Sequence, residues 1–378
     1  MKIIFVAKVF AEWGGLERVW TDKMNALSQV PDYEVWLVTT DQGSHSYPYV
    51  FSSKVHLVDL DIRFVQQYQY GFLKRILVKY SLMRVYKYRF QQLLCQIKPD
   101  VLVTNSSENV SILNRWRGGI PLVVECHGTY DRPFHMDKMT IYKRIKSYFF
   151  YHSIAKANRL VALTQKDADK WKRINPQACA IADIVHLNDT ETYSDCLNKR
   201  VIFVGRIDPQ KGYRFLKDIW QLVSERHSEW RLDIYGEGAD KVENKEMLPA
   251  GENVFAHPHT SGIFNKYKDS SILILTSVYE PFGLVMPEAM SCGVPVVAFD
   301  CPYGPSDIVT DGKDGFLVKS WDVNEFANKI CLLMEDEQLR LKMGKNAITS
   351  SSRYTKDAIM PMWNQLFESI ITKKPKSL

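Results

Sequence analysis

Two glutamates, Glu280 and Glu288, flank a Pro-Phe-Gly turn and are separated by seven residues. The turn residue Gly283 follows the apolar run 271–277 and precedes a helical pattern from Leu284 to Cys292. The amides of a first helical turn, together with the helix dipole, can bind phosphate oxygens. A carboxylate accepts two hydrogen bonds and therefore suits vicinal hydroxyls. This segment predicts a site for an anionic, hydroxyl-rich ligand. The alternatives are a capping role for Glu280 and an ordinary helix-surface role for Glu288.

Two cations, Arg206 and Lys211, follow a second predicted strand, and each lies next to a glycine, Gly205 or Gly212. An arginine offers a planar fork of donors and a lysine a point charge, and both suit a pyrophosphate. The alternative is a loop with two solvated surface charges.

Two further glycines, Gly14 and Gly15, follow the first predicted strand and precede a helix. Glycine lets the backbone approach a ligand closely, although the spacing is not GxGxxG and argues against a dinucleotide site. A simple turn is the alternative. His127 closes another predicted strand in Glu125-Cys126-His127-Gly128, and either faces a ligand or is a buried structural histidine.

Parallel sheets covered by helices must position these residues, because short β-branched runs alternate with longer helical patterns throughout. We expect α/β architecture with two doubly wound, Rossmann-like domains, whose carboxyl strand ends line one cleft. The domains are predicted at 1–190 and 191–355, with a helix in 356–378 that packs back toward the first domain and an exposed linker at 181–199. Strands are predicted near 2–9, 33–40, 54–59, 100–105, 121–127 and 159–164, and then near 200–205, 231–236, 253–257, 271–277, 294–299 and 315–318.

At these motifs the sequence resembles the retaining glycosyltransferases of family 4, whose fold of two Rossmann-like domains is called GT-B. The resemblance covers nearly the whole chain, and the pair Glu280 and Glu288 is its most specific part. The segment from Phe299 to Ile308 is similar to bacterial members that move galactose or N-acetylhexosamines in surface-glycan assembly. The other matching motifs are Gly14-Gly15, His127, Gly205-Arg206, Lys211-Gly212, Gly236-Glu237-Gly238 and the Gly-x-Pro-Val-Val that begins at Gly293.

The resemblance implies a role for each matched residue. Arg206 and Lys211 would hold the diphosphate of a nucleotide sugar, Glu288 the ribose diol and Glu280 the sugar hydroxyls. His127 would face the sugar, and no separate nucleophile is implied, since retaining members are thought to react on one face of the sugar. The remaining donor-binding positions that it implies are Gly14, Gly15, Gly205, Gly236, Phe282, Gly283 and Leu284.

No metal site and no cofactor are predicted. Asp59-Leu60-Asp61 has the DxD form that other glycosyltransferases use for a divalent cation, but it ends a predicted strand far in sequence from Glu280. His257 and His259 have no nearby carboxylates or thiols in the sequence, so they are weak evidence for a metal.

Composition supports two soluble domains. The chain has 378 residues, with 46% hydrophobic and 24% charged, and a single core stops growing at roughly 250–300 residues. We expect a cytoplasmic protein, since no signal peptide and no apolar run of roughly 20 residues is present. The seven scattered cysteines indicate reduced thiols.

Positive charge is concentrated in the first half, where residues 1–190 carry 26 Lys+Arg against 17 Asp+Glu, or +9; the remainder carries 23 against 26, or −3. Residues 62–99 contain eight basic side chains and no acid, and 138–166 also lacks acids. Aromatic residues are interleaved with these cations, which is typical of a surface that binds anionic lipid. Solvated basic helix faces are the alternative. Leu73, Leu77, Tyr80 and Met83 are expected to pack on the sheet, and the predicted membrane-facing cations are Lys74, Arg75, Lys79, Lys143, Arg144 and Lys146.

The sequence thus predicts a retaining transferase that moves a hexose or N-acetylhexosamine from a UDP-sugar to a lipid-linked or glycan acceptor. It would act at the inner face of the cytoplasmic membrane and would not bind nucleic acid. An epimerase of the same fold and a noncatalytic glycan-binding subunit are the alternatives. The epimerase would need an acid/base pair at the sugar carbon, and the sequence identifies none.

Overall fold

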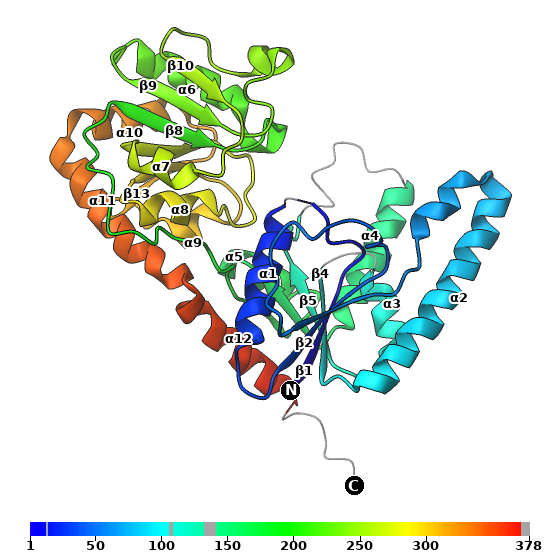
Figure 1. The fold of residues 1–378 in the computed structure, drawn as a ribbon. Helices are drawn as coiled ribbons and strands as arrows, with labels where there is room; N and C mark the ends of the chain where they lie inside the picture. The colour runs from blue at the N-terminus through cyan, green and yellow to red at the C-terminus, as the bar shows by residue number, and fades with distance from the viewer. Residues whose placement is uncertain (13, 106–108, 132–140, 372–378) are drawn as a thin grey trace. The chain divides into compact units, whose positions relative to one another are not determined.

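The computed structural model describes residues 1–12, 14–105, 109–131 and 141–371; the side chains of Tyr142, Lys143 and residues 242–244 are not described. The chain forms two compact units (Figure 1). Unit 1 consists of Met1–Ile184 and the residues from Ile359 onward, and unit 2 is Val185–Ala358. The boundaries predicted from the sequence lie at 190 and 355 instead.

Unit 1 contains a parallel sheet in the order β3-β2-β1-β4-β5-β6-β7. Its strands are mostly buried, as expected where helices cover both faces of a parallel sheet. They are β1 (Lys2–Val6), β2 (Glu34–Thr39), β3 (Val55–Asp59), β4 (Val101–Asn105), β5 (Leu122–Cys126), β6 (Arg159–Ala162) and β7 (Ala178–Ala180). The last of these strands is absent from the sequence prediction.

Helices cover both faces of this sheet. One core joins it to α1 (Gly15–Leu27) and α12 (Lys356–Ile371) through Trp20, Met24, Trp363 and Phe367. The opposite core contains residues of α2 (Phe72–Ile97), α3 (Asn109–Trp116), α4 (Ile141–Ala155) and α5 (Gln165–Trp171). Unit 1 is therefore doubly wound, and α12 brings the end of the chain onto the face that carries α1.

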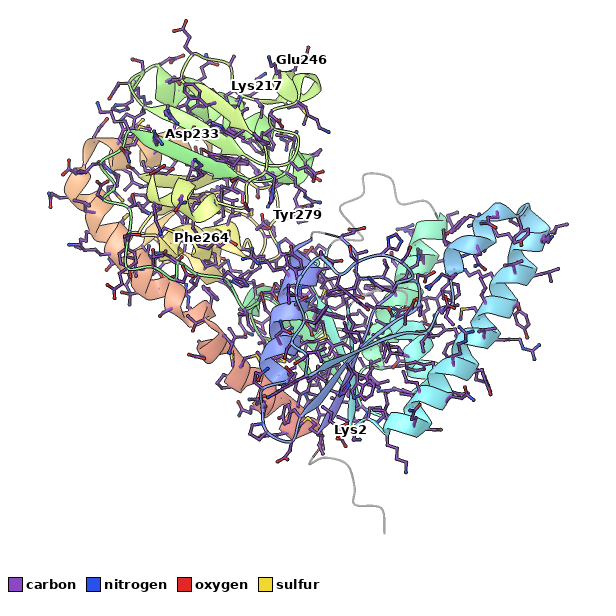
Figure 2. All side chains as sticks on the ribbon, in the orientation of Figure 1. Lys2, Lys217, Asp233, Glu246, Phe264 and Tyr279 are labelled. Atoms are coloured by element: carbon purple, nitrogen blue, oxygen red, sulfur yellow. The ribbon has the colours of Figure 1, made fainter. Side chains whose placement is uncertain are left out.

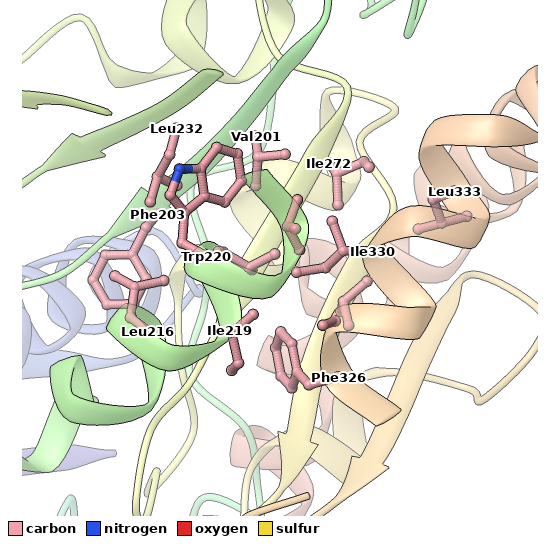
Figure 3. Packing of buried hydrophobic residues seen from close by; sticks show 14 of the residues in the cluster. Val201, Phe203, Leu216, Ile219, Trp220, Leu232, Ile272, Phe326, Ile330 and Leu333 are labelled. Atoms are coloured by element: carbon pink, nitrogen blue, oxygen red, sulfur yellow. The ribbon is translucent and has the colours of Figure 1, made fainter. Parts of the chain in front are cut away.

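Unit 2 contains a second parallel sheet, in the order β10-β9-β8-β11-β12-β13. Figure 3 shows part of its main core, where Ile219 of α6 (Tyr213–Ser224) lies toward Phe326 of α10 (Val323–Glu335) and Leu216 lies beside Phe203. The strands are β8 (Arg200–Val204), β9 (Arg231–Tyr235), β10 (Val254–His257), β11 (Ile272–Leu275), β12 (Val296–Asp300) and β13 (Gly315–Lys319). The remaining helices are α7 (Ile263–Lys268), α8 (Val285–Ser291), α9 (Pro305–Ile308) and α11 (Glu337–Ser351).

The predicted packing of α2 is wrong. Leu73, Leu77 and Tyr80 are 77%, 70% and 67% exposed. The residues that pack are Tyr86, Phe90, Leu94 and Ile97, in the second half of the helix. The apolar periodicity runs along the whole of α2, but only its second half lies over the sheet.

The predicted exposed linker is also partly wrong. Ile181 and Ile184 belong to the core of unit 1, and Val185 and Cys196 are buried as well. Its middle, from His186 to Tyr193, is intermediate or exposed, in keeping with its polar composition.

Candidate functional site

The sheet of unit 2 changes its winding direction between β8 and β11, which are neighbours although β9 and β10 intervene in sequence. Doubly wound sheets bind ligands at the carboxyl ends of the strands at such a point. Gly205 and Arg206 directly follow β8, and Ser277 and Glu280 follow β11. The chain therefore gathers the predicted diphosphate and sugar residues at one edge of this sheet.

An ion pair forms the centre of this site. Lys211 Nζ donates to Glu280 Oε2 at 2.6 Å, and Ser277 Oγ donates to the same oxygen at 3.0 Å. The Glu280 side chain is 7% exposed and that of Lys211 16%, so the pair is largely shielded from water. The backbone of Glu280 bonds to Pro302 and Gly304, which fixes the carboxylate in place. Sequence reasoning predicted Lys211 and Glu280 separately but missed their contact and the role of Ser277.

Tight backbone packing positions Lys211. It ends a short 3₁₀ helix, η3 (Pro209–Lys211), and Gly212 follows with a φ of 68°. A Cβ on Gly212 would lie 1.9 Å from the carbonyl oxygen of Thr276, so only glycine allows this approach to the end of β11. Arg206, in contrast, is exposed, and no carboxylate within the described part of the chain pairs with it. It remains available to an anion.

The segment from Glu280 to Glu288 forms the turn and helix that the sequence predicts. Gly283 has a φ of 97°, and α8 begins two residues later, at Val285. Phe282 is buried against Tyr354 with ring centroids 5.3 Å apart, so only its backbone can address a ligand, and Leu284 is half-buried. Glu288 is buried and accepts a hydrogen bond from the Tyr267 hydroxyl at 3.1 Å.

Gly205 and Gly236 differ in what a side chain would meet. A Cβ on Gly236 would lie 1.9 Å from the carbonyl oxygen of Gly205, so the close approach of two strand ends requires glycine at 236. A Cβ on Gly205 would make only ordinary contacts, the nearest at 3.4 Å. The packing therefore requires glycine at 236, whereas at 205 a Cβ would fit in ordinary contact with Lys211 and Phe203.

The sheet of unit 1 changes its winding direction between β1 and β4. A cavity of about 120 Å³ lies at this point, and its lining includes Phe10 after β1, Asn105 at the end of β4, and Glu17 and Trp20 of α1. Gly14 is the N-cap of α1 without a side-chain hydrogen bond, and Gly15 is its first residue. Burial raises the pKa of Glu17 above its ordinary value.

His127 directly follows β5, one strand further along this sheet edge. Its Nε2 lies 3.1 Å from Glu125 Oε2, and its Nδ1 lies 3.6 Å from Asp183 Oδ2. Burial lowers the pKa of His127, but the carboxylates of Asp183 and Glu125 outweigh burial and raise that pKa to about 9. His127 is therefore an imidazolium at neutral pH.

Glu125 is held from three sides, which sequence reasoning missed. Besides His127, Trp20 Nε1 donates to its Oε2 at 3.1 Å and Lys23 Nζ at 2.5 Å. Lys23 is 1% exposed, and its Nζ lies 3.9 Å from the ring centroid of Trp363 in α12. The sequence feature that could have indicated this contact is Lys23 itself, which lies on the same buried helical stripe as Val19 and Leu27.

The predicted membrane-facing cations lie on two helices of unit 1. Lys74 and Lys79 are exposed and Arg75 is half-buried, all in the first half of α2. Arg144 and Lys146 are exposed in α4, while the side chain of Lys143 lies outside the described residues. The apolar residues Phe72, Ile76 and Ile145 are exposed beside them.

The two carboxylates of the DxD segment are already paired with a neighbouring arginine. Arg63 contacts Asp59 at 2.7 Å and Asp61 at 2.6 Å, and the amide of Gly43 donates to Asp59. Burial raises the pKa of Asp59, but its hydrogen bonds and Arg63 outweigh burial and hold it below the ordinary value. Among the described residues no group of three or more potential ligands is arranged to hold a metal ion. His257 is instead paired with Asp233 at 2.8 Å; Asp233 is labelled in Figure 2.

Two family models match the chain one after the other. The model described as Glycosyltransferase Family 4 matches residues 13–188, and the one described as Glycosyl transferases group 1 matches residues 196–350. The chain belongs to the family 4 type of glycosyltransferases. This membership confirms the resemblance that the motifs indicate.

Curated relatives match only part of their own length. An uncharacterized glycosyltransferase from Haemophilus influenzae is 28% identical over 218 residues, which cover 56% of this chain and 62% of that protein. The poly(ribitol-phosphate) alpha-N-acetylglucosaminyltransferase of Staphylococcus aureus is 30% identical over 220 residues, or 57% of this glycosyltransferase and 43% of that protein. The matched regions thus span less than two thirds of these relatives.

Solved structures match nearly the whole glycosyltransferase. The crystal structure of TarM has a TM-score of 0.79 at 17% identity and covers 97% of this chain and 98% of its own. A second structure, of Staphylococcus aureus TarM, was solved with Fondaparinux, alpha-GlcNAc-glycerol and UDP and has a TM-score of 0.73. The predicted GT-B fold is confirmed.

Proposed function

We propose that this glycosyltransferase moves a hexose or N-acetylhexosamine from a UDP-sugar to a lipid-linked or glycan acceptor, with retention and without a metal or other cofactor. The product would serve surface-polysaccharide biosynthesis, as the names of the relatives suggest. The observation that carries the proposal is the Lys211–Glu280 pair beside the exposed Arg206, at the switch point of the second sheet. UDP bound to the structurally similar TarM supports the nucleotide.

The chemistry requires positive charge at the leaving group. Breaking the bond between the anomeric carbon and the phosphate oxygen leaves negative charge on the diphosphate, while the acceptor oxygen bonds to the carbon from the same face. The acceptor proton passes to a diphosphate oxygen. Fixed cations that stabilise such developing charge typically contribute several kcal/mol. Arg206 and Lys211 would supply that charge, Glu280 would bind sugar hydroxyls, and Glu288 would bind the ribose diol.

Nucleotide release from UDP-, GDP- and ADP-sugars tests the proposal. Each donor is offered with and without a polyprenyl-diphosphate-linked sugar, in the presence and absence of excess EDTA. We expect UDP release that depends on the acceptor and persists in EDTA, and NMR of the product should show a retained anomeric configuration. A new UDP-sugar without UDP release would instead indicate an epimerase. Activity that is lost in EDTA and restored by manganese would contradict the metal-free proposal.

We also propose that unit 1 binds the anionic inner face of the cytoplasmic membrane. Five exposed residues of α2 recur at the spacing of a single helical stripe: Phe72, Leu73, Ile76, Leu77 and Tyr80. Lys74 and Lys79 flank this stripe on an acid-free helix, the combination that interfacial helices present to anionic lipid. No helix in the described ranges has both the length and the apolar character needed to cross a bilayer. A stripe at the surface is consistent with peripheral binding.

Vesicle sedimentation tests this part of the proposal. Replacing Lys74, Arg75 and Lys79 by Ser should weaken binding to anionic vesicles by about 3 kcal/mol, or roughly a hundredfold, since each such residue contributes about 1 kcal/mol. The matched control replaces Lys217, Lys241 and Lys245 of unit 2, which are also exposed. Equal losses in the two triple variants would indicate nonspecific charge, and no loss in the first would mean that α2 is only a solvated helix.

A further inference from the structure

Trp321, in unit 2, is an exposed tryptophan in an unusual backbone conformation. It lies between β13 and Asp322, the N-cap of α10, and its φ is 73°. This left-handed region is unfavourable for a residue with a side chain, and it persists only where the surrounding structure holds it. The residue is nevertheless 43% exposed, so burial of the indole accounts for only part of this arrangement.

The indole ring of Trp321 is supported on one face. It stacks on Phe215 of α6, with ring centroids 5.1 Å apart and the planes 12° apart, and it contacts Phe299 in an edge geometry at 5.8 Å. Trp321 also lines an open hollow of about 660 Å³, which Phe215 does not line. The hollow therefore lies on the side of the ring away from Phe215. Its volume is within the range of roughly 300–1,000 Å³ that small-molecule sites occupy.

Polar groups of both charges line the same hollow. Asp311 Oδ1 accepts from the Leu317 amide at 2.9 Å, which fixes this exposed carboxylate and leaves Oδ2 without a hydrogen bond in the described ranges. Lys319, the last residue of β13, is exposed and forms no ion pair among the described residues. Ser320 Oγ donates to the carbonyl oxygen of Asp300 at 2.8 Å and can still accept a hydrogen bond.

This combination suits a neutral ligand that is rich in hydroxyls. The C–H bonds on one face of a pyranose carry partial positive charge and can pack on the negative face of an indole. Carboxylates accept hydrogen bonds from sugar hydroxyls, and an ammonium donates to them. An anionic ligand would meet the carboxylates of Asp300 and Asp311, and a cationic ligand would meet Lys319. The charges therefore disfavour nucleotides and cations alike.

We propose that Trp321, Asp311 and Lys319 form a binding site for a neutral glycan chain on unit 2. One pyranose stacks on the free face of the indole, and its hydroxyls bond to the carboxylate and the ammonium. None of these residues is assigned to the nucleotide sugar, so the inference goes beyond the proposed function. In a glycosyltransferase with a glycan acceptor, such a site would raise the local concentration of that acceptor.

The binding test uses maltotetraose, chitotetraose and tetragalacturonate with the full chain, without any nucleotide sugar. Trp321→Gly removes the ring and suits the left-handed backbone, so it should fold. Trp321→Tyr keeps an aromatic ring, and Asp311→Asn keeps an oxygen for the Leu317 amide. Phe255→Ala is the matched control, because Phe255 is 40% exposed on β10, at the opposite edge of the same sheet.

Saturation-transfer NMR should detect binding of at least one neutral tetrasaccharide to the parent, to Trp321→Tyr and to Phe255→Ala. We expect binding to be at least tenfold weaker in Trp321→Gly and severalfold weaker in Asp311→Asn. Tetragalacturonate should bind the parent at least tenfold more weakly than the neutral tetrasaccharide does. Three results would each overturn the proposal: no neutral binding to the parent at millimolar concentration, equal binding by the parent and Trp321→Gly, or equal binding of tetragalacturonate.

Fluorine NMR of the chain labelled with fluorotryptophan locates the bound glycan. The resonance that is missing from Trp321→Gly belongs to Trp321, and it should shift when the neutral tetrasaccharide is added. An unmoved resonance would overturn the glycan site even in a protein that releases UDP from a UDP-sugar as proposed. A shifted resonance in a protein that releases no UDP would instead contradict the proposed function and leave the glycan site in place.

Discussion

Each of the two units has a lysine–glutamate ion pair near the carboxyl ends of its strands. Lys23 and Glu125 are 2.5 Å apart in unit 1, and Lys211 and Glu280 are 2.6 Å apart in unit 2. Their surroundings differ. The first pair is 1% and 2% exposed and is closed by Trp20 and Trp363, while the second is 16% and 7% exposed.

Because the two lysine–glutamate pairs differ in exposure, we expect a different role for each of them. A sealed pair cannot exchange its partner for a ligand, so it can act only on its neighbour, His127. In the proposed function an accessible pair would open, because an incoming diphosphate would replace Glu280 as the partner of Lys211 and free the carboxylate for hydroxyls. The same substitution, lysine to methionine, should therefore lower mainly the stability in unit 1 and mainly the rate of transfer in unit 2.

The largest expected effect is on stability in unit 1. Lys23→Met leaves Glu125 charged and buried, and removing one partner of a buried pair costs about 3–5 kcal/mol. Hydrogen exchange followed by mass spectrometry should show faster opening of β1, β4 and β5 and no change in β8 and β11. Adding Glu125→Gln to Lys23→Met removes the stranded charge and should recover most of the loss. Comparable increases in exchange in both sheets would mean that the destabilisation is not confined to unit 1.

The second effect is on transfer in unit 2. Lys211→Met should lower kcat by about 100- to 1000-fold, the range found when one preorganised charge-stabilising donor is removed. Its cost in stability should stay near 1–3 kcal/mol, since water can reach the pair and Ser277 still donates to Glu280. Steady-state kinetics and thermal unfolding of the two lysine variants complete the comparison. A loss of stability in Lys211→Met as large as that in Lys23→Met would remove the contrast.

The sequence singled out both residues of the open pair, although not their contact, and missed the sealed pair, for a physical reason. Lys211 and Glu280 lie in loops next to predictable strands, so their placement at a switch point follows from the order of elements. Glu125, Lys23 and Trp363 come together only through the docking of α1 and α12 on the same sheet face, which no local pattern specifies. The error in α2 has a similar origin, since periodicity shows an apolar stripe but not where the underlying sheet ends.

Local propensity also explains the remaining omissions. Most strands with runs of Val, Ile and Leu were predicted within a few residues, as β1 and β12 illustrate. The strand β7 consists of Ala-Cys-Ala, which carries neither β-branched residues nor alternation, and only its pairing with β6 makes it a strand.

A third effect concerns the pH dependence of the sealed site. The pKa of folded His127 is raised to about 9 from an ordinary 6.5. The folded state thus binds the proton more tightly, so this contribution to stability is complete below pH 6.5 and is lost as the pH rises through 9. At 1.36 kcal/mol per unit the loss is about 3 kcal/mol at most. Urea unfolding at pH 7 and pH 10 should show this loss of stability in the parent and not in His127→Gln. Equal losses in the two proteins would mean that groups other than His127 cause the pH dependence.

The smallest expected effect is that of Arg206→Gln in unit 2. Arg206 is exposed and pairs with no carboxylate in the described ranges, so its removal should change the melting temperature very little, as surface substitutions usually stay within about 0.5 kcal/mol. UDP should nevertheless bind about 10- to 100-fold more weakly, because a charged hydrogen bond to the diphosphate contributes about 1.5–3 kcal/mol. Calorimetry at two salt concentrations checks the cause, since the difference between parent and variant should shrink as salt screens an exposed charge. Arg214→Gln is the matched control, an exposed arginine of the same unit that stacks on Phe215. If both variants lose the same UDP affinity, Arg206 contributes only to the overall electrostatic potential of unit 2. The open site then consists of Lys211 and the two glutamates.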